Sequence, residues 1–128
     1  MRFLLDTHTF LWWIDNDPKL SATANTIITD INNEIFFSVV SGWELAIKAQ
    51  IGKLTLPNNL QQFIAEELNQ NYFTVLPITL AHTLQIYSLP LHHRDPFDRM
   101  LIAQSQLEKM ILLTVDTLIT QYEVETIW

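Results

Sequence analysis

Short apolar runs alternate with segments of helical periodicity along the chain, and this alternation constrains the fold more than any other feature. The first run, 2–5, ends at Asp6, and a later run, 111–115, ends at Asp116. Between such runs, apolar residues recur at the spacing of an amphipathic helix. Alternating strands and helices predict a parallel sheet with helices on both faces. The expected strands are 2–5, 34–39, 72–76, 111–115 and an edge strand within 124–128, and the expected helices are 8–14, 22–31, 41–51, 60–69, 79–87 and 97–110.

The composition favours one globular domain that spans residues 1–128. Apolar residues make up 48% of the chain, which is enough to fill a core, and we find no repeat, low-complexity tract or linker. The lack of cysteine excludes disulfides, zinc–thiolate sites and thiol nucleophiles. No apolar run reaches the roughly 20 residues of a membrane span, and the acid at position 6 does not suit a signal peptide. We therefore expect a cytoplasmic protein without membrane contact.

The net charge of −7 argues against a general nucleic-acid coat protein, because contact with phosphates normally requires a basic face. It does not exclude an enzyme that acts on nucleic acid, since such an enzyme can use its acids to hold metal ions that contact the phosphate. The positions of the acids therefore matter more than their number.

Four acids follow predicted strands or begin predicted helices. Asp6 and Asp116 come directly after strands, while Glu44 and Asp98 lie within the first turns of helices. In an open α/β sheet, ligands bind outside the carboxyl ends of the strands. The pattern therefore places the four carboxylates at one edge of the sheet.

Each of these acids also has a structural interpretation as part of a helix cap. Asp6 and Asp116 could be N-caps. The stretch from Ser41 to Glu44 matches a capping box, and Asp98 stands at the capping-box position behind Asp95. We assign Asp95 mainly to capping and leave Asp98 free for a site.

Taken together, the acids point to a bound metal ion. Carboxylates that converge repel one another and raise each other's pKa. Mg²⁺ or Mn²⁺ relieves that repulsion, because hard cations prefer oxygen ligands. Such an ion can activate water and stabilise the charge that builds on a phosphate during hydrolysis.

The histidines contribute less to this prediction. His92 and His93 form with Arg94 a local positive patch beside Asp98 that could contact substrate. His8 is expected to bond to helix-end backbone, with orientation of Asp6 or of a phosphate as the alternative. His82 is expected on a helix surface. The spacing typical of a histidine metal site is absent from the sequence.

With so negative a chain, a phosphate substrate has to be held by a few local cations. Lys48 lies one helical turn beyond Glu44, and Arg94 and Arg99 flank Asp98. We expect these three side chains to contact the substrate.

Three stretches of the chain resemble the PIN-domain family, in particular the toxin ribonucleases of bacterial toxin–antitoxin pairs (VapC type). They are LLDTHTFLWW, SVVSGWELAIKAQIGKL, and LPLHHRDPFDRMLIAQS followed by LLTVD, in the family's order and across nearly the whole length. The combination is specific to the family, whereas any single acid is not. The resemblance implies a PIN-like three-layer α/β/α sandwich with a central, mostly parallel sheet of four to five strands.

By this resemblance, Asp6, Glu44 and Asp98 fall on the family's three principal metal-binding acids, and Asp116 falls on its more variable fourth acid. Thr114 matches a hydroxyl position near the site. The resemblance further implies an endoribonuclease that uses Mg²⁺ or Mn²⁺, a homodimer, and a cognate antitoxin protein that blocks the enzyme.

Three other functions fit the sequence less well. A phosphoacceptor receiver domain needs a lysine beyond its last strands, and no Lys or Arg follows Lys109. A two-carboxylate glycosidase would not need the third and fourth acids. A binding module with this fold that has lost catalysis is disfavoured by the complete acid set, and an assay decides between it and an enzyme.

Overall fold

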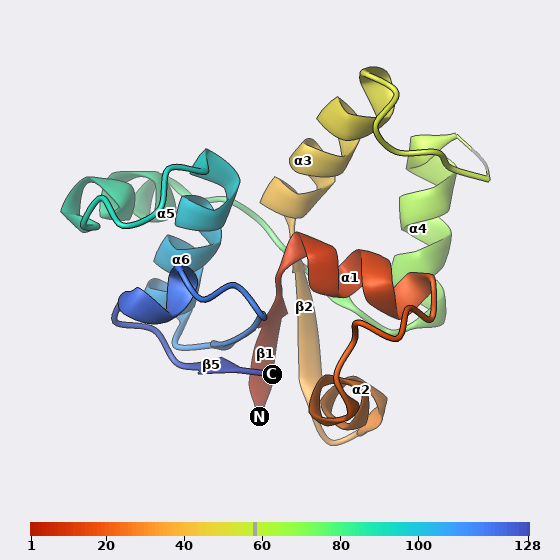
Figure 1. Cartoon of the computed structure of the whole chain (residues 1–128), viewed down its shortest axis with the longest axis horizontal. Coiled ribbons are helices and arrows are strands. Elements are labelled where there is room, and N and C mark those ends of the chain that lie inside the picture. Colours follow the sequence, from red (N-terminus) through yellow and green to blue (C-terminus); the bar gives the residue numbers. More distant parts are fainter. Residues whose placement is uncertain (58) are drawn as a thin grey trace.

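The computed structural model describes residues 1–57 and 59–128, and it contains one five-stranded sheet (Figure 1). The strands run in the order β3-β2-β1-β4-β5, and every neighbouring pair is parallel. The predicted α/β fold with a sheet of four to five strands is therefore confirmed. The elements in chain order are β1 (Arg2–Leu5), α1 (Thr7–Ile14), α2 (Ala22–Thr29), β2 (Glu34–Ser38), α3 (Val39–Gln50), α4 (Leu60–Gln70), β3 (Thr74–Leu76), α5 (Leu80–Gln85), the 3-10 helix η1 (Ile86–Ser88), α6 (Pro96–Glu108), β4 (Ile111–Leu113), the 3-10 helix η2 (Ile119–Gln121) and β5 (Thr126–Ile127).

Successive side chains of the strands pack on opposite faces of the sheet, as strand geometry requires. Leu4 belongs to a core that α6 and η2 cover, whereas Phe3 and Leu5 belong to a second core under α1, α2 and α4. Both faces are therefore buried, which explains why the strands are continuously apolar rather than alternating. The result is the predicted three-layer sandwich, with α5 and α6 on one side of β1 and α1 and α4 on the other (Figure 1).

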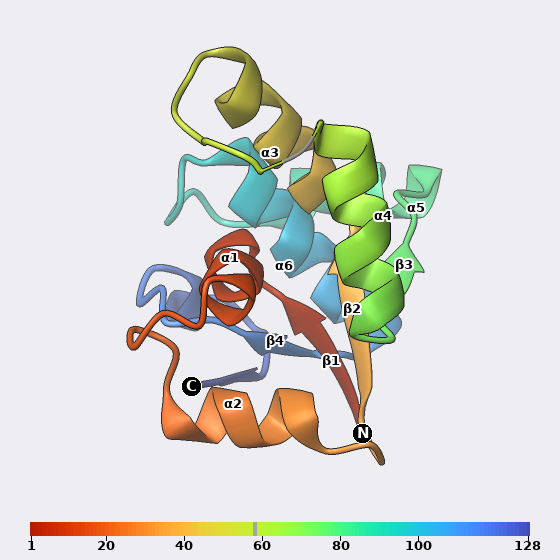
Figure 2. The same ribbon diagram turned by 90° about the vertical axis from the view of Figure 1, so that its right-hand side faces the viewer.

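One end of the sheet carries the beginnings of three helices. The strands β1 and β2 pass directly into α1 and α3, and in both views α3 lies beyond the end of the sheet opposite the N-terminus (Figures 1 and 2). Because all strands are parallel, their carboxyl ends meet at this edge.

The helix α3 begins two residues earlier than the expected segment 41–51. Ser38, the last residue of β2, is its N-cap and accepts a hydrogen bond from the amide of Val40 (3.0 Å). The predicted capping box between Ser41 and Glu44 is therefore wrong: the Ser41 hydroxyl instead lies 2.8 Å from that of Thr7. The strand passes into the helix without a loop, so the first polar residue after the apolar run already serves as the cap. Glu44 is thereby free of a capping role.

His82 is buried, at 1% exposure, which contradicts its predicted place on a helix surface. Its Nδ1 accepts the amide hydrogen of Thr79 (3.0 Å), and the Thr79 hydroxyl accepts that of His82 (3.3 Å), which makes a capping box at the start of α5. On the other side of the ring, Nε2 lies 3.2 Å from Oε1 of Glu108 on α6. The rest of this turn faces solvent, with Leu80 73% exposed, so His82 alone points inward, where the capping box and Glu108 satisfy its ring nitrogens.

Smaller differences also have local causes. The strand β3 begins at Thr74 rather than at 72, because Tyr72 adopts a left-handed backbone (φ 56°) after α4. The expected helix 79–87 is divided into α5 and η1. The predicted edge strand near the C-terminus is confirmed as β5. Gly52 has a φ of 77° directly after α3, which is the conformation that favours glycine at a helix end.

Among residues 1–57 and 59–128, no helix is both long and apolar enough to cross a bilayer.

Candidate metal centre

The structure brings the four predicted acids together at the carboxyl edge of the sheet. Asp6 follows β1 and Asp116 follows β4, while Glu44 lies on α3 and Asp98 in the first turn of α6. Asp6, Glu44 and Asp116 are all close enough to Asp98 for their charges to raise its pKa. The convergence expected from the strand ends is therefore observed.

Thr114 links two of these acids. Its hydroxyl donates a hydrogen bond to Oδ2 of Asp6 (2.7 Å) and accepts one from the backbone amide of Asp116 (3.0 Å). Thr114 is only 3% exposed, so the hydroxyl holds Asp6 from inside the protein rather than facing solvent. This contact fixes which oxygen of Asp6 remains free.

Two buried carboxylate oxygens have no hydrogen-bond partner among the described residues: Oδ1 of Asp6 and Oε1 of Glu44. The second oxygen of Glu44 pairs with Lys48 (Oε2–Nζ 2.8 Å), one helical turn away. A buried polar atom without a partner costs the folded state about 1–3 kcal/mol, and more where it carries charge. Two such oxygens in one acid cluster indicate a site built for a cation.

The acids also destabilise one another's charged forms. Burial raises the pKa of Asp98 to about 8, and the neighbouring carboxylates Asp6, Asp95, Glu44 and Asp116 add to the shift. Burial likewise raises the pKa of Asp6, against the lowering effect of its bond to Thr114. A divalent ion reverses this penalty, because it stabilises the carboxylates that burial and repulsion disfavour.

The donor set fits Mg²⁺ or Mn²⁺. Carboxylate oxygens are the ligands that hard divalent cations prefer. Asp6, Glu44 and Asp98 could each offer such an oxygen at this edge. The metal centre predicted from the sequence therefore has residues that suit it.

His93 lies among these acids in a way that the sequence analysis missed. Its Nε2 is 3.0 Å from Oδ2 of Asp98 and 2.9 Å from Oδ2 of Asp116, and its Nδ1 accepts the amide hydrogen of Asp95 (3.1 Å). The sequence prediction gave His93 a place in a positive patch that could contact substrate, and did not place it between two acids. The available signal was its position just before the start of α6, where a loop residue can turn back onto the first helical turn.

The division of roles between Asp95 and Asp98 is supported by the geometry. Oδ1 of Asp95 accepts hydrogen bonds from the amides of Phe97 (2.8 Å) and Asp98 (3.3 Å), which makes Asp95 the N-cap of α6. The Asp95 amide bonds to His93, not to Asp98, so no reciprocal capping box forms. Pro96 occupies the first helical turn, as expected.

The three predicted substrate-binding cations differ in their exposure and in their contacts within the protein. Arg94 is exposed, and Lys48 is half-buried in its pair with Glu44. The guanidinium of Arg99 donates to the carbonyl oxygens of Pro90 (2.9 Å), in the loop before α6, and of Ile86 (3.3 Å), in η1. These bonds give Arg99 a structural role that the sequence did not indicate.

Two aromatic side chains stand beside the acids. Trp43 precedes Glu44 and is 57% exposed, and Phe97 precedes Asp98. Their rings meet edge to face, with centroids 5.0 Å apart, across the first turns of α3 and α6. The pair joins the two helices that carry these acids.

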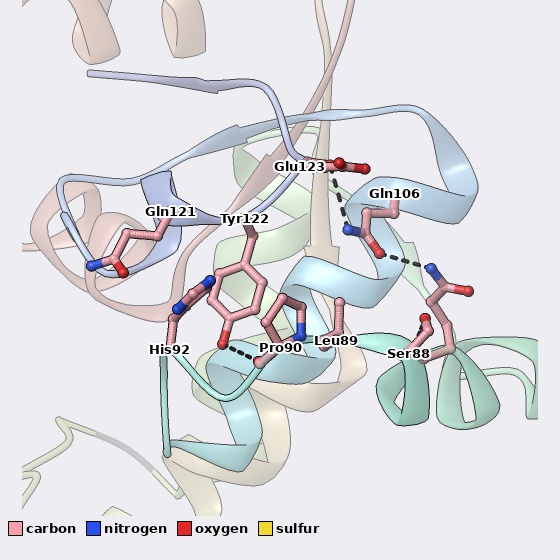
Figure 3. Close-up of a pocket in the computed structure, with 9 residues that line it drawn as sticks. Ser88, Leu89, Pro90, His92, Gln106, Gln121, Tyr122 and Glu123 are labelled. Atoms are coloured by element: carbon pink, nitrogen blue, oxygen red, sulfur yellow. Dashed lines mark hydrogen bonds between the residues drawn. The ribbon is translucent and has the colours of Figure 1, made fainter.

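A separate cavity of about 520 Å³ lies between η1, α6 and η2 (Figure 3). Its lining includes Gln85, Gln106 and His92, and none of the four acids contributes to it. Gln85 donates to Gln106 (2.8 Å) along one wall of this cavity. Because neither His93 nor the acids line this cavity, we place the candidate centre by its chemistry rather than by cavity size.

Comparison with known sequences gives one family. A sequence model of the PIN domain matches residues 3–125. Ribonuclease VapC16 of Mycobacterium tuberculosis is 31% identical over 70 residues, which are 52% of this chain and 50% of that protein. The chain thus aligns with about half the length of this relative.

Solved structures share the fold over nearly the full length. VapBC2 from Rickettsia felis, bound to a DNA fragment from its promoter, matches with a TM-score of 0.75 and 15% identity over 100% of this chain and 99% of that chain. DNA-bound VapBC from Salmonella typhimurium gives 0.73 and 16% over 99% and 97% of the two chains. VapBC-1 from nontypeable Haemophilus influenzae gives 0.67 and 18% over 99% and 97%.

Proposed function

The chain belongs to the PIN domain family, and we propose that it is a divalent-metal-dependent endoribonuclease that acts as the toxin of a toxin–antitoxin pair. The relative named ribonuclease VapC16 supports RNA as the substrate, although the alignment spans only half of that protein. We infer hydrolysis of phosphodiester bonds in RNA with Mg²⁺ or Mn²⁺ as the cofactor.

One observation carries the proposal. The free oxygens of Asp6 and Glu44 are buried without a partner, within a group of acids that raises the pKa of Asp98. Capping does not account for them, because neither buried oxygen accepts a hydrogen bond from a backbone amide of the described residues.

The residues of the centre would divide the work between holding an ion and orienting its ligands. Asp6, Glu44 and Asp98 would hold the ion, with Asp116 beside them. The hydroxyl of Thr114 positions Asp6, and the ammonium of Lys48 positions Glu44. When bound, the ion would supply an activated water and stabilise negative charge on the phosphate.

Substrate would be held by local cations at the rim. Arg94 is exposed directly after His93 and can reach a phosphate without leaving an existing ion pair among the described residues. Lys48 is the second candidate cation, but it would have to share its ammonium between Glu44 and the phosphate. Arg99 would contribute through the loop that it stabilises.

We further propose that a cognate antitoxin binds and blocks the enzyme in the cytoplasm, and that the active form is a homodimer. The structural neighbours that carry the VapBC name support an antitoxin partner. A metal-dependent ribonuclease free in the cell would damage that cell, so an inhibitor is required.

The direct test is hydrolysis of a pool of structured and unstructured RNA by the purified protein. We expect cleavage with Mg²⁺ or Mn²⁺ and none when a chelator removes the metal. Failure to cut any RNA with either metal would contradict the ribonuclease activity.

A separate test addresses the toxin role. Expression of the wild-type chain alone should arrest growth, and Asp6→Asn should relieve the arrest. Harmless expression of a protein that cleaves RNA in vitro would contradict the toxin role and leave the ribonuclease activity standing.

A further inference from the structure

The acids of the candidate centre fall into two groups by how their oxygens are bonded. Oδ1 of Asp6 and Oε1 of Glu44 are buried and unpartnered. Asp116 is the opposite: Oδ1 accepts the amide hydrogen of Leu118 (2.8 Å), and Oδ2 lies 2.9 Å from Nε2 of His93. Both oxygens of Asp116 are therefore already engaged within the protein.

We infer that the side chain of His93 takes the place that a second metal ion would occupy between Asp98 and Asp116, so that the centre holds one ion. In this assignment Asp6, Glu44 and Asp98 are the metal ligands, and His93 and Asp116 are positioning residues. The inference rests on the proposed metal-dependent function, and it replaces the role of Asp116 as a metal ligand that the family resemblance suggests.

The hydrogen-bonding pattern of the ring determines which nitrogen carries the proton. Nδ1 accepts the backbone hydrogen of Asp95 (3.1 Å), so Nδ1 has its lone pair in that bond. A neutral imidazole with an acceptor at Nδ1 bears its hydrogen on Nε2. The Nε2–H then points between the two carboxylates, and this nitrogen has no lone pair to offer a metal.

The position of Nε2 is that of a bridging cation. It lies 3.0 Å from Oδ2 of Asp98 and 2.9 Å from Oδ2 of Asp116, and these three atoms lie within 4.8 Å of one another. An ion that bridged the two acids would have to displace the N–H from both. Oδ1 of Asp98 makes no hydrogen bond with the described residues, and the charges of Asp6 and Glu44 both act on this carboxyl, so we assign this oxygen to the ion that they share.

Hydrogen bonds with Tyr122 and Arg99 hold the backbone of the loop that carries His93. The backbone amide of His93 donates to the hydroxyl of Tyr122 (2.8 Å), which in turn donates to the carbonyl of Pro90 (2.8 Å). Arg99 donates to the same hydroxyl (3.3 Å) and to the His93 carbonyl (3.4 Å). Displacement of this backbone would break these bonds, and rotation of the ring would break the bond of Nδ1 to the Asp95 amide.

The experiment counts Mn²⁺ ions by titration calorimetry and by electron paramagnetic resonance. The wild-type protein should bind one Mn²⁺ with an uncoupled spectrum. His93→Ala should bind two, and the spectrum should show a spin-coupled pair bridged by Asp98. His93→Gln, whose amide can still donate to the carboxylates, should bind one.

His82 provides the matched control. Its ring also accepts a backbone hydrogen at Nδ1 and faces a carboxylate with Nε2, but it lies against Glu108, away from the unpartnered oxygens. His82→Ala should lower the melting temperature and leave the count at one. A general loosening of the fold would instead change the count in both alanine variants.

Two ions in the wild type, or one in a folded His93→Ala, overturns the inference. Binding of no Mn²⁺ by the wild type overturns the proposed metal dependence as well.

Should His93→Ala not fold, two milder variants still test the assignment. Asp98→Asn should weaken Mn²⁺ binding more than Asp116→Asn, because Asp98 would contact the ion directly, whereas loss of a supporting residue typically costs about 10–100-fold in affinity. Equal losses in the two variants would contradict the assignment.

Discussion

Two buried histidines in this protein make the same pair of contacts and yet stand in different chemical settings. His82 and His93 each accept a backbone hydrogen at Nδ1 and face carboxylate oxygen with Nε2. His82 faces a single carboxylate, that of Glu108, and thereby joins α5 to α6. His93 faces two carboxylates, and unpartnered buried oxygens lie in the same cluster.

The contacts of a histidine therefore do not by themselves distinguish a structural role from a functional one. What distinguishes them is the balance of charge around the ring. At His82 one donor meets one acceptor, whereas at His93 one donor meets a group of acids whose repulsion it only partly relieves. We propose that a metal ion balances the negative charge that remains on these acids.

The largest expected contrast is in activity. Asp6→Asn, Glu44→Gln and Asp98→Asn should each lower RNA hydrolysis by at least about a hundredfold, as loss of a positioned metal would. Glu108→Gln alters the carboxylate beside His82 and should leave the rate near that of wild type. Steady-state assays with saturating Mg²⁺ measure these rates of RNA hydrolysis. Near-normal rates in any two acid-site variants would contradict the assignment of the site.

The second contrast is in stabilisation by metal. Free ion at a hundred times its dissociation constant adds about 2.7 kcal/mol to the free energy of unfolding, which for a domain of this size raises the melting temperature by several degrees. Asp98→Asn should abolish most of that rise while leaving the metal-free protein as stable as wild type or more so. Glu108→Gln should keep the full rise.

Thermal melts in chelator and in millimolar Mn²⁺ make this comparison. Asp6→Asn serves as a companion to Asp98→Asn, because asparagine caps a helix nearly as well as aspartate. A wild-type protein that shows no metal-dependent shift would mean that the acids do not form one metal site.

A third contrast concerns pH in the absence of metal. The folded protein holds the Asp98 proton up to a pH of about 8, whereas the unfolded chain releases it near its ordinary pKa of 3.8. The folded state therefore binds more protons between these values, so its free energy of unfolding should fall as the pH rises, by at most about 1.4 kcal/mol per pH unit for one proton. The raised pKa of Asp6 acts in the same direction.

Urea unfolding in chelator from pH 5 to pH 8 measures this slope. Asp98→Asn should flatten it, and Glu108→Gln should not. An equal slope in wild type and Asp98→Asn would show that the Asp98 carboxyl does not carry the repulsion that distinguishes the two histidine environments.

The smallest expected effect is on RNA binding by the rim of the site. Arg94 is exposed next to His93, so Arg94→Ala should weaken RNA binding a few-fold at low salt and less at high salt, as a single phosphate contact would. The melting temperature of Arg94→Ala should not change.

Arg99→Ala should instead lower the melting temperature, because it removes hydrogen bonds to the carbonyl oxygens of Pro90 and Ile86. RNA titrations and melts of both variants separate the two roles, and unchanged RNA binding by Arg94→Ala would place the binding surface elsewhere.

The sequence predicted most of the architecture because the strands are apolar on both faces and the helices are periodic. Its errors fall where polar side chains have two possible partners. Ser41 and Glu44 matched a capping box, yet Ser38 caps α3, because β2 runs into the helix without a loop. The expected contact of Arg99 with substrate stays a prediction, and its guanidinium donates to the carbonyl oxygens of Pro90 and Ile86.

The sequence alone predicted a parallel sheet, the succession of strands and helices along the chain, and the acids at the edge of the sheet, because periodicity and position after a strand are local properties of the chain. The order of the strands within the sheet came from the structure. The tertiary structure shows which oxygens of these acids are hydrogen-bonded within the protein and which are free. Asp116 is engaged by a histidine 23 residues away and Asp6 by a threonine 108 residues away, while the free oxygens of Asp6 and Glu44 have no partner among the described residues. Hydrogen bonding between distant segments depends on distances and angles that no local pattern encodes. The set of acids could therefore be predicted from the sequence, whereas their proposed division into metal ligands and positioning residues could not.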